Sequence, residues 1–221
     1  MKFGIILPIW RLSVGDAERL TCRAEELGWD GVFIPDHVVA MPATVEHYGP
    51  SWPDPLSLLA YLAGKTSRIL LGTSVIVLPY RHPLAVAKAA ATVDQVSGGR
   101  FICGVGVGWD EAEFQVLKIP FHERGRLSDE YLALMQAAWS AETFDFDGRY
   151  FSFQRVGFAP RPVQQPRPPV WVASALRGSC WLRRVSRRYR PNVMRLPPPW
   201  VKVPQCLPGN TMPAGCQSAS P

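Results

Sequence analysis

The feature that most constrains the fold is a regular alternation between short apolar runs and segments with apolar residues at helical spacing. The apolar runs read FGIILPI at 3–9, GVFIP at 31–35, RILLGTSVIVLP at 68–79, RFICGVGVGW at 100–109 and PPVWVAS at 168–174. Strands that are apolar throughout, with helices between them, are typical of a parallel sheet covered by helices. Each such unit takes roughly 30 or more residues, so residues 1–174 are predicted to hold about five units.

Between the apolar runs, four segments carry the signals of helices. In the first, Ser13 can act as an N-cap and Gly28 can end the helix, with apolar or small side chains at helical spacing between them. The helices are expected at 14–27, 54–67, 82–100 and 111–141, the last interrupted at Pro120. Residues 40–53 are expected to form a loop. A hairpin is predicted at 143–153, where apolar and polar residues alternate about an Asp-Gly pair.

Polar residues and glycines follow the apolar runs, at the points where the strands would end. A parallel sheet forms either an open, doubly wound fold or a barrel, and in both the ligands collect at the carboxyl ends of the strands. The residues at those ends are 8–10, Asp36 and His37, 73–75, 104–108, and Ala173 with Ser174. These positions form the candidate site.

Asp36 and His37 are the chemically most informative of these residues. An imidazole titrates near neutral pH, and an adjacent carboxylate can tune or orient it, which suits a group that gives or takes a proton. The alternative is a polar pair on a surface loop. Residue types alone leave both interpretations open.

The glycines at 104–108 follow a Gly-x-Gly-x-Gly spacing, which differs from the Gly-x-Gly-x-x-Gly fingerprint of dinucleotide-binding proteins. They can let the backbone approach a ligand closely, with exposed amides at a helix start, or they can serve tight packing. Trp10, Tyr80 and Trp109 can wall an aromatic site or belong to the core. Of the remaining histidines, one at position 82 is expected to cap a helix, and one at 122 to be structural.

The composition of the chain argues against several classes of protein. The longest apolar runs are too short to span a bilayer, and the N-terminus lacks the pattern of a signal peptide, so a cytoplasmic protein is expected. Five scattered cysteines without a Cys-x-x-Cys pair indicate reduced thiols. Four histidines without a metal-binding spacing make a metal site unexpected.

Charge divides the chain near residue 175. All 18 acidic residues lie within 1–174, whereas 175–221 holds eight of the 24 basic residues, eight prolines and three cysteines. We therefore predict a patterned domain at 1–174 and a basic, proline-rich tail at 175–221 in which no buried strand is evident. The tail is a frameshifted continuation, a disordered arm for nucleic acid or anionic membrane, or an irregular cap on the sheet. Nucleic-acid binding is not expected, because the basic residues lack a regular spacing.

Seven motifs in series resemble those of the bacterial-luciferase-like flavin and deazaflavin oxidoreductases, especially the branch that uses coenzyme F420. They read MKFGIILP, AEELGWDGVFIPDH, RILLGTSVIVLPYRHP, SGGRFICGVGVGW, HERGR, FDGRYF and PRPVQQPRPPVWVA, and they extend from residue 1 to about 173. The resemblance implies a (β/α)8 TIM barrel with a flavin or deazaflavin at its C-terminal face. Because the pattern supplies only about five strand–helix units, we expect a partial TIM barrel, with the family's last third absent.

The resemblance also assigns roles to the residues after the second and third predicted strands. His37 matches the family's histidine that acts as base or proton donor, and Asp36 matches an acid that contacts the polar edge of the ring. Ser74 and Val75 match a non-proline cis peptide that backs the cofactor ring.

Further roles follow for the residues after the later strands. Gly106 and Gly108 are expected to bind the cofactor, and the backbone amides of Ala173 and Ser174 to meet its pyrimidine edge. Trp109 stands where some sugar-oxidising relatives have a glutamate. Their specificity for sugar phosphates is therefore not expected to carry over.

Three functions are compatible with the sequence. The first is an oxidoreductase that transfers hydride between F420 and an unknown small organic substrate, as a homodimer like intact members of the family. The second keeps the fold and is an FMN-dependent monooxygenase. The third is a non-catalytic remnant whose basic tail binds acidic partners. Because an unclosed barrel leaves unpaired backbone groups at its edges, the chain is expected to be poorly stable and weakly active unless a second subunit covers the gap.

Overall fold

The computed structural model describes residues 3–173 and the backbone of 193–194. The predicted tail at 175–221 otherwise lies outside the described residues, so the boundary near 175 stays a prediction. No helix in the described part of the chain is long and apolar enough to cross a membrane.

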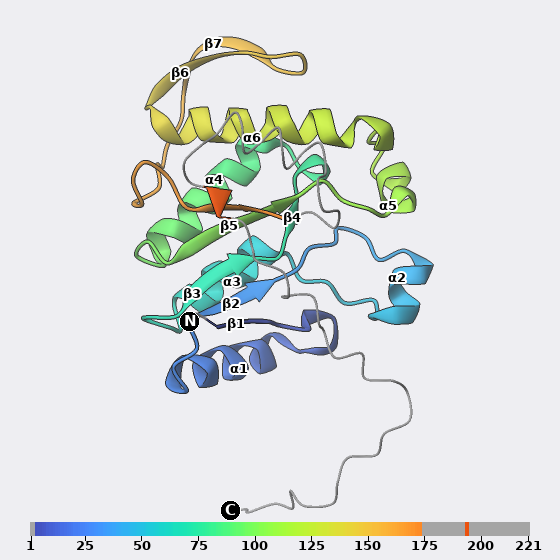
Figure 1. The fold of residues 1–221 in the computed structure, drawn as a ribbon, viewed down its shortest axis with the longest axis vertical. Coiled ribbons are helices and arrows are strands. Elements are labelled where there is room, and N and C mark those ends of the chain that lie inside the picture. The colour runs from blue at the N-terminus through green and yellow to red at the C-terminus, as the bar shows by residue number, and fades with distance from the viewer. Residues whose placement is uncertain (1–2, 174–192, 195–221) are drawn as a thin grey trace, which may run out of the picture.

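A single parallel sheet forms the centre of the structure (Figure 1). Its strands are β1 (Gly4–Ile6), β2 (Gly31–Ile34), β3 (Leu70–Thr73), β4 (Ile76–Val77), β5 (Phe101–Gly106), β8 (Val170–Val172) and β9 (Val193–Met194). The order is β1-β2-β3-β5-β8-β9, and β4 adds to β5. Among the described strands, β1 and β9 are the two edges, so the sheet is not closed into a barrel. The short β9, which lies within the predicted tail, pairs in parallel with β8. The expectation that 175–221 contains no buried strand stays a prediction.

Four helices cover the outer face of this sheet: α1 (Val14–Glu26), α3 (Pro55–Ala63), α4 (Pro83–Val96) and α6 (Arg124–Ser140). Two shorter helices, α2 (Pro42–His47) and α5 (Glu111–Val116), lie at the carboxyl ends of the strands (Figure 1). The 3-10 turns are η1 (Ile9–Arg11), η2 (Leu78–Tyr80) and η3 (Phe121–Glu123). Neighbours along the chain pack side by side, α1 on α3, α3 on α4 and α4 on α6. Val32, Leu71 and Val105 lie fully buried in the core that these helices share with the sheet.

The opposite, inner face of the sheet is built around one phenylalanine. Phe33 projects from β2, and a Cβ added to Gly4 or Gly72 on the flanking strands would lie within 2.6 Å of its ring. Its ring stacks on Trp171 of β8, with the centroids 5.3 Å apart. Glycines on the neighbouring strands therefore make room for an aromatic pair across the inner face.

The predicted helix signals are confirmed where they can be checked. Ser13 and Asp16 form a reciprocal capping box at the start of α1. His82 caps α4, since its side chain accepts a hydrogen bond from the amide of Leu84, and α4 ends before Gly98 and Gly99, which both have positive φ. The helical region 111–141 is interrupted around Pro120 as expected, with η3 between α5 and α6.

Two local expectations were wrong. The segment 40–53 is not all loop, because α2 forms there with Pro42 at its first turn, a position where a missing amide hydrogen costs nothing. The third apolar run is not one strand. It divides into β3 and β4 on either side of a cis peptide between Ser74 and Val75.

The predicted hairpin is confirmed as β6 (Thr143–Asp147) and β7 (Ser152–Gly157), which pair antiparallel. It packs on α6 at the outside of the molecule (Figure 1). The carboxylate of Glu130 on α6 accepts hydrogen bonds of 2.7–2.8 Å from the amides of Arg149, Tyr150 and Phe151 in the hairpin loop. One helical carboxylate thus holds the whole turn.

Candidate active site

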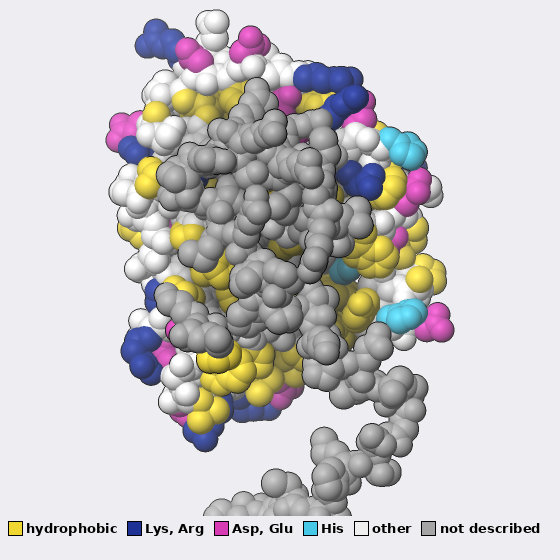
Figure 2. Space-filling model, in the orientation of Figure 1, with side chains coloured by type: hydrophobic (Ala, Val, Ile, Leu, Met, Phe, Trp, Pro, Cys, Tyr) yellow, Lys and Arg dark blue, Asp and Glu magenta, His cyan; other side chains and the backbone are white. Residues whose placement is uncertain are grey.

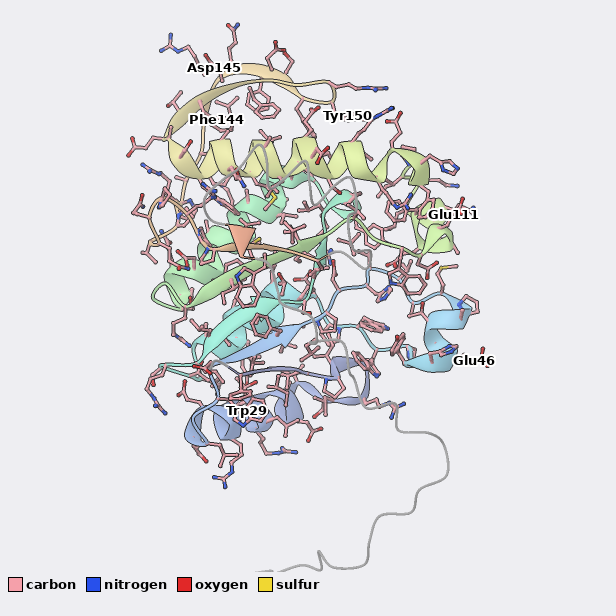
Figure 3. All side chains as sticks on the ribbon, viewed as in Figure 1. Trp29, Glu46, Glu111, Phe144, Asp145 and Tyr150 are labelled. Carbon is pink, nitrogen blue, oxygen red and sulfur yellow. The ribbon has the colours of Figure 1, made fainter. Side chains whose placement is uncertain are left out.

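The carboxyl ends of the strands meet at one edge of the sheet, and two short helices lie there. α2 follows β2 and α5 follows β5, and Figure 1 shows both at the end to which the strands point. Figure 3 marks them by Glu46 on α2 and Glu111 on α5. On the same side, hydrophobic side chains gather beside histidines (Figure 2). The strand ends that the sequence singled out are therefore brought together.

His37 is held by a carboxylate from the other side of this edge. Its Nδ1 lies 2.7 Å from Oε2 of Glu113 on α5, and the two side chains are 10% and 0% exposed. Oε1 of Glu113 accepts hydrogen bonds from the backbone amides of Val38 and Val39, at 2.7 and 3.1 Å. Among the described residues, no hydrogen bond involves the second ring nitrogen, Nε2.

The position of Glu113 follows from the start of α5. Asp110 is the N-cap, and its Oδ1 accepts hydrogen bonds from the amides of Ala112 and Glu113. Its Oδ2 accepts a hydrogen bond of 3.2 Å from the hydroxyl of Thr44, which links α5 to α2. Burial raises the pKa of Glu113, but the hydrogen bonds from His37 and from the two amides outweigh it, so the pKa lies below the ordinary value. Glu113 is therefore an ionised, fixed acceptor.

Asp36 is bonded to Arg81 and not to His37. Its two oxygens accept hydrogen bonds of 2.7 and 2.8 Å from the Arg81 guanidinium, and the amide of Val77 adds a third at 3.0 Å. Burial raises the pKa of this carboxyl, and the guanidinium opposes that rise. The side chain has no exposed surface. The carboxylate expected to orient His37 and to meet a ring edge is thus engaged with Arg81, and Glu113 takes its place at the imidazole.

The predicted cis peptide is confirmed between Ser74 and Val75. Both residues are half-buried, whereas residues 71–73 and 76–80 around them are fully buried. The Ser74 amide donates to the carbonyl of Ile34 at 2.7 Å, which fixes the bend against the end of β2.

Gly106, the last residue of β5, and Gly108 lie in close contact with neighbouring side chains. A Cβ added at Gly106 would lie 2.6 Å from Val75, and one at Gly108, where φ is +79°, would lie 2.7 Å from Val77 and 2.8 Å from Phe114. These distances favour the packing interpretation over a close approach to a ligand. A role for either glycine at a cofactor stays a prediction.

The end of β8 supplies the last predicted residues. The amide of Ala173 donates to the carbonyl of Val105 at 3.0 Å, so this amide already has a partner within the sheet. Ser174 lies outside the described residues. A contact of either residue with a cofactor stays a prediction.

Aromatic side chains surround the imidazole. The ring centroid of His37 lies 4.5 Å from that of Trp52 and 6.1 Å from that of Trp109, both edge to face. Trp10 joins through Trp52, at 5.2 Å. Tyr80 does not belong to this group. It is buried against Phe114, and burial with the nearby Glu113 charge raises its pKa far above the ordinary value.

Sequence reasoning missed Glu113, Arg81 and Trp52. The only available signal was the spacing of Asp110 and Glu113, an N-cap residue with an acid three positions later, which is typical of a helix start. That pattern predicts α5 but not the contact with His37. The described residues contain no group of three or more His, Cys, Asp or Glu side chains that could hold a metal ion.

Comparisons with known proteins gave three kinds of match. The model of the luciferase-like monooxygenase family matches residues 1–179. An F420-dependent glucose-6-phosphate dehydrogenase from Beutenbergia cavernae is 36% identical over 179 residues, which cover 79% of this chain and 51% of that protein. The oxygenase component of a flavin-dependent trigonelline monooxygenase from Acinetobacter baylyi is 32% identical over 136 residues, covering 59% of this chain and 38% of that protein.

A solved structure matches as well. The crystal structure of monooxygenase RslO1 from Streptomyces bottropensis superposes with a TM-score of 0.68 and 31% sequence identity, over 79% of this chain and 54% of that chain. The chain spans 35%, 38% and 66% of the lengths of the first three curated relatives that it matches.

Proposed function

We propose, on the premise that this chain belongs to the luciferase-like monooxygenase family, that it transfers hydride between coenzyme F420 and a small organic substrate, with His37 as the proton-transfer group. Family membership confirms the resemblance seen in the sequence motifs, and the fold is the expected partial TIM barrel. The relatives named above depend on F420 or on flavin. The observation that carries the proposal is the hydrogen bond between Nδ1 of His37 and the buried Glu113, which leaves Nε2 for a substrate.

The residues at the strand ends fit a planar ring. Ser74, Val75 and Ala173 are half-buried at the ends of otherwise buried strands. The indole N–H of Trp171, two residues before Ala173 on β8, is buried and has no hydrogen-bond partner among the described residues, so it offers a donor to a polar ring atom. Ser74 and Val75 would back the ring, and F420, when bound, would supply the hydride donor or acceptor. A role for Asp36 would be indirect, through Arg81.

The protein's own part in the reaction is proton handling. With Nδ1–H donating to Glu113, a neutral imidazole keeps its lone pair on Nε2. In the direction of substrate oxidation, Nε2 takes the hydroxyl proton as hydride leaves the carbon, and in reduction Nε2–H returns it. The rings of Trp52 and Trp109 lie edge to face with the imidazole, and the His37 side chain is only 10% exposed.

Anaerobic turnover tests the proposal. The full chain is mixed with oxidised F420 and small alcohols, or with reduced F420 and the matching ketones, and the F420 absorbance is followed. We expect turnover that falls about 10²–10⁴-fold in His37→Ala, the range that general acid–base catalysis contributes. His122→Ala, in η3, is the matched control and should retain turnover. Equal rates for wild type and His37→Ala would contradict the assignment.

A second candidate is an FMN-dependent monooxygenase. The trigonelline monooxygenase component and RslO1 favour it, because both are monooxygenases and both are over 30% identical to this chain where they match. Oxygen uptake with reduced FMN and a substrate, without anaerobic F420 turnover, would support this function instead. The homodimer expected from the family stays a prediction that the molecular mass in solution would check.

A further inference from the structure

We propose that the substrate at this site is an uncharged organic molecule with an aromatic or alicyclic ring, which packs on Trp109 and Tyr48 beside Nε2 of His37. The inference rests on the proposed function, because it names the class of substrate for the same site. It separates this chain from relatives that act on a phosphorylated sugar, such as the F420-dependent glucose-6-phosphate dehydrogenase.

The aromatic cluster consists of Trp10, Tyr48 and Trp52, whose rings contact one another, and of Trp109, which joins them through the His37 ring at 6.1 Å. Trp52 lies 5.2 Å from Trp10 and 6.0 Å from Tyr48 between ring centroids. The Trp10 and Tyr48 rings meet edge to face at 5.1 Å. These rings come from η1, from the end of α2 and from the loops after α2 and β5, so distant segments converge on His37.

The outer members of the aromatic cluster are open to solvent. Trp109 is 66% exposed and Tyr48 is 42% exposed. The inner member has no free polar group, because the indole N–H of Trp52 donates to the carbonyl of Gly49 at 3.0 Å. The surface next to the imidazole is therefore apolar and aromatic, and a ring packed on it would gain both apolar burial and edge-to-face contacts.

Two charged groups at this edge of the sheet, Glu113 and Arg81, are already paired within the described structure. Glu113 is bonded to the imidazole, and Arg81 is shared between Asp36 and Asp54. A phosphate or carboxylate on the substrate would meet no free cation from these residues.

Two exposed basic side chains lie next to the aromatic cluster along the sequence. Arg11 follows Trp10 in η1, and His47 precedes Tyr48, with its ring centroid 6.3 Å from that of Tyr48. Of these two, Arg11 carries the permanent charge, so the experiment below includes it.

The aromatic cluster is held in place before any ligand arrives. The hydroxyl of Thr44 on α2 bonds to Asp110 at the start of α5, which ties the helix that carries Tyr48 to the loop that carries Trp109. The bonds from Glu113 to the amides of Val38 and Val39 fix the segment after His37. Little side-chain freedom is then lost on binding, which favours affinity for a rigid, ring-shaped ligand.

Saturation-transfer NMR on the full chain tests the proposal, with acetophenone as the neutral aromatic probe and glucose 6-phosphate as the charged one. We expect transfer to the acetophenone ring, a dissociation constant at least about tenfold weaker in Trp109→Ala, and a change within about threefold in Trp109→Phe. Trp29→Ala is the matched control. Trp29 is also partly exposed, and it precedes β2 at the other end of the sheet (Figure 3).

Each result then decides one question. Acetophenone binding that is equal in wild type and Trp109→Ala would overturn the proposal, and so would tighter binding of glucose 6-phosphate that is lost in Arg11→Ala. Binding of acetophenone without any F420 turnover would leave the substrate class standing and reject the proposed redox function. F420 turnover with glucose 6-phosphate but not with neutral ring compounds would support the proposed redox function and reject the proposed substrate class.

Discussion

At both ends of the parallel sheet, a buried or half-buried charged side chain hydrogen-bonds to the backbone of a neighbouring turn, but the two ends differ in what else that side chain binds. At the amino ends of the strands, Arg100 donates five hydrogen bonds from its side chain, to the carbonyls of Ala63, Thr66, Ile69 and Ser97 and to the Thr66 hydroxyl. Glu25 accepts from the amides of the neighbouring loop at 67–69. Every donor or acceptor of these two side chains is directed at holding a turn.

At the carboxyl ends, Glu113 holds the turn after β2 in the same way, through two backbone amides. Its other oxygen, however, binds an imidazole whose second nitrogen has no partner among the described residues. Of these two ends, only the carboxyl end therefore combines a fixed carboxylate with a side chain that can transfer a proton. A charged side chain that bonds only to backbone groups and hydroxyls of a turn stabilises the fold, whereas Glu113, which also bonds to His37, fixes a group able to move a proton.

The largest expected effect belongs to the amino end. Arg100→Met should lower the free energy of unfolding by roughly 3–5 kcal/mol, because several carbonyls lose a charged donor. Turnover per folded molecule should be unchanged. Urea unfolding together with anaerobic turnover measures both quantities. Arg19→Met, on the exposed face of α1, is the control and should stay within about 0.5 kcal/mol of wild type.

Gly108→Ala should cost roughly 2–4 kcal/mol even without a cofactor, because the new Cβ meets Val77 and Phe114 and the backbone has a positive φ. Thermal unfolding of the cofactor-free chain checks this. Gly125→Ala in α6, where nothing lies within 4 Å of the new Cβ, should be neutral or stabilise by about 0.5–1 kcal/mol. If the Gly108→Ala chain is as stable as wild type and loses only cofactor binding, the result would contradict the packing role and favour a contact of Gly108 with the cofactor.

Glu113→Gln should distinguish the contribution of Glu113 to stability from its contribution to turnover. We expect a stability loss of roughly 1–3 kcal/mol from the disturbed amide bonds. Turnover should fall about 10- to 100-fold with an altered pH profile, and Glu113→Asp should restore part of it, since the carboxylate positions the imidazole. Glu130→Gln, which disturbs the comparable hydrogen bonds to the hairpin, should cost similar stability and leave turnover intact. A similar loss of turnover in both variants would remove the distinction between the two carboxylates.

The smallest expected effect is on the pH dependence of stability. For both Glu25 and Glu113, burial raises the pKa, but hydrogen bonds outweigh it, so both carboxyls have a pKa below the ordinary value in the folded protein. These bonds come mainly from backbone amides at Glu25, and from His37 and two amides at Glu113. Their stabilisation is therefore complete above the unfolded pKa of about 4.3 and is lost as pH falls through the folded value. Glu25→Gln and Glu113→Gln should each flatten the fall in unfolding free energy below that pH. A steeper fall in either variant would contradict the assigned direction.

The sequence predicted the elements of this fold better than the contacts of its site. Apolar runs and helix caps are local signals, and they located β2, β5 and α1 because each of these elements is specified by neighbouring residues. The pairing of His37 with Glu113 joins residues 76 positions apart, and no local pattern encodes it. Asp36 was expected to orient His37 because the two residues are adjacent in the sequence. Its actual partner, Arg81, lies 45 positions later, and only the fold reveals that contact.

The most direct test of the central claim is an NMR titration of the full chain, with nitrogen-15-labelled histidine, against F420. The account predicts that Nδ1 of His37 is protonated before addition and that the Nε2 signal of His37 shifts as F420 binds, while the signals of His122 stay unchanged. A His37 spectrum that does not respond to bound F420, or that shows the proton on Nε2 and none on Nδ1, would contradict it.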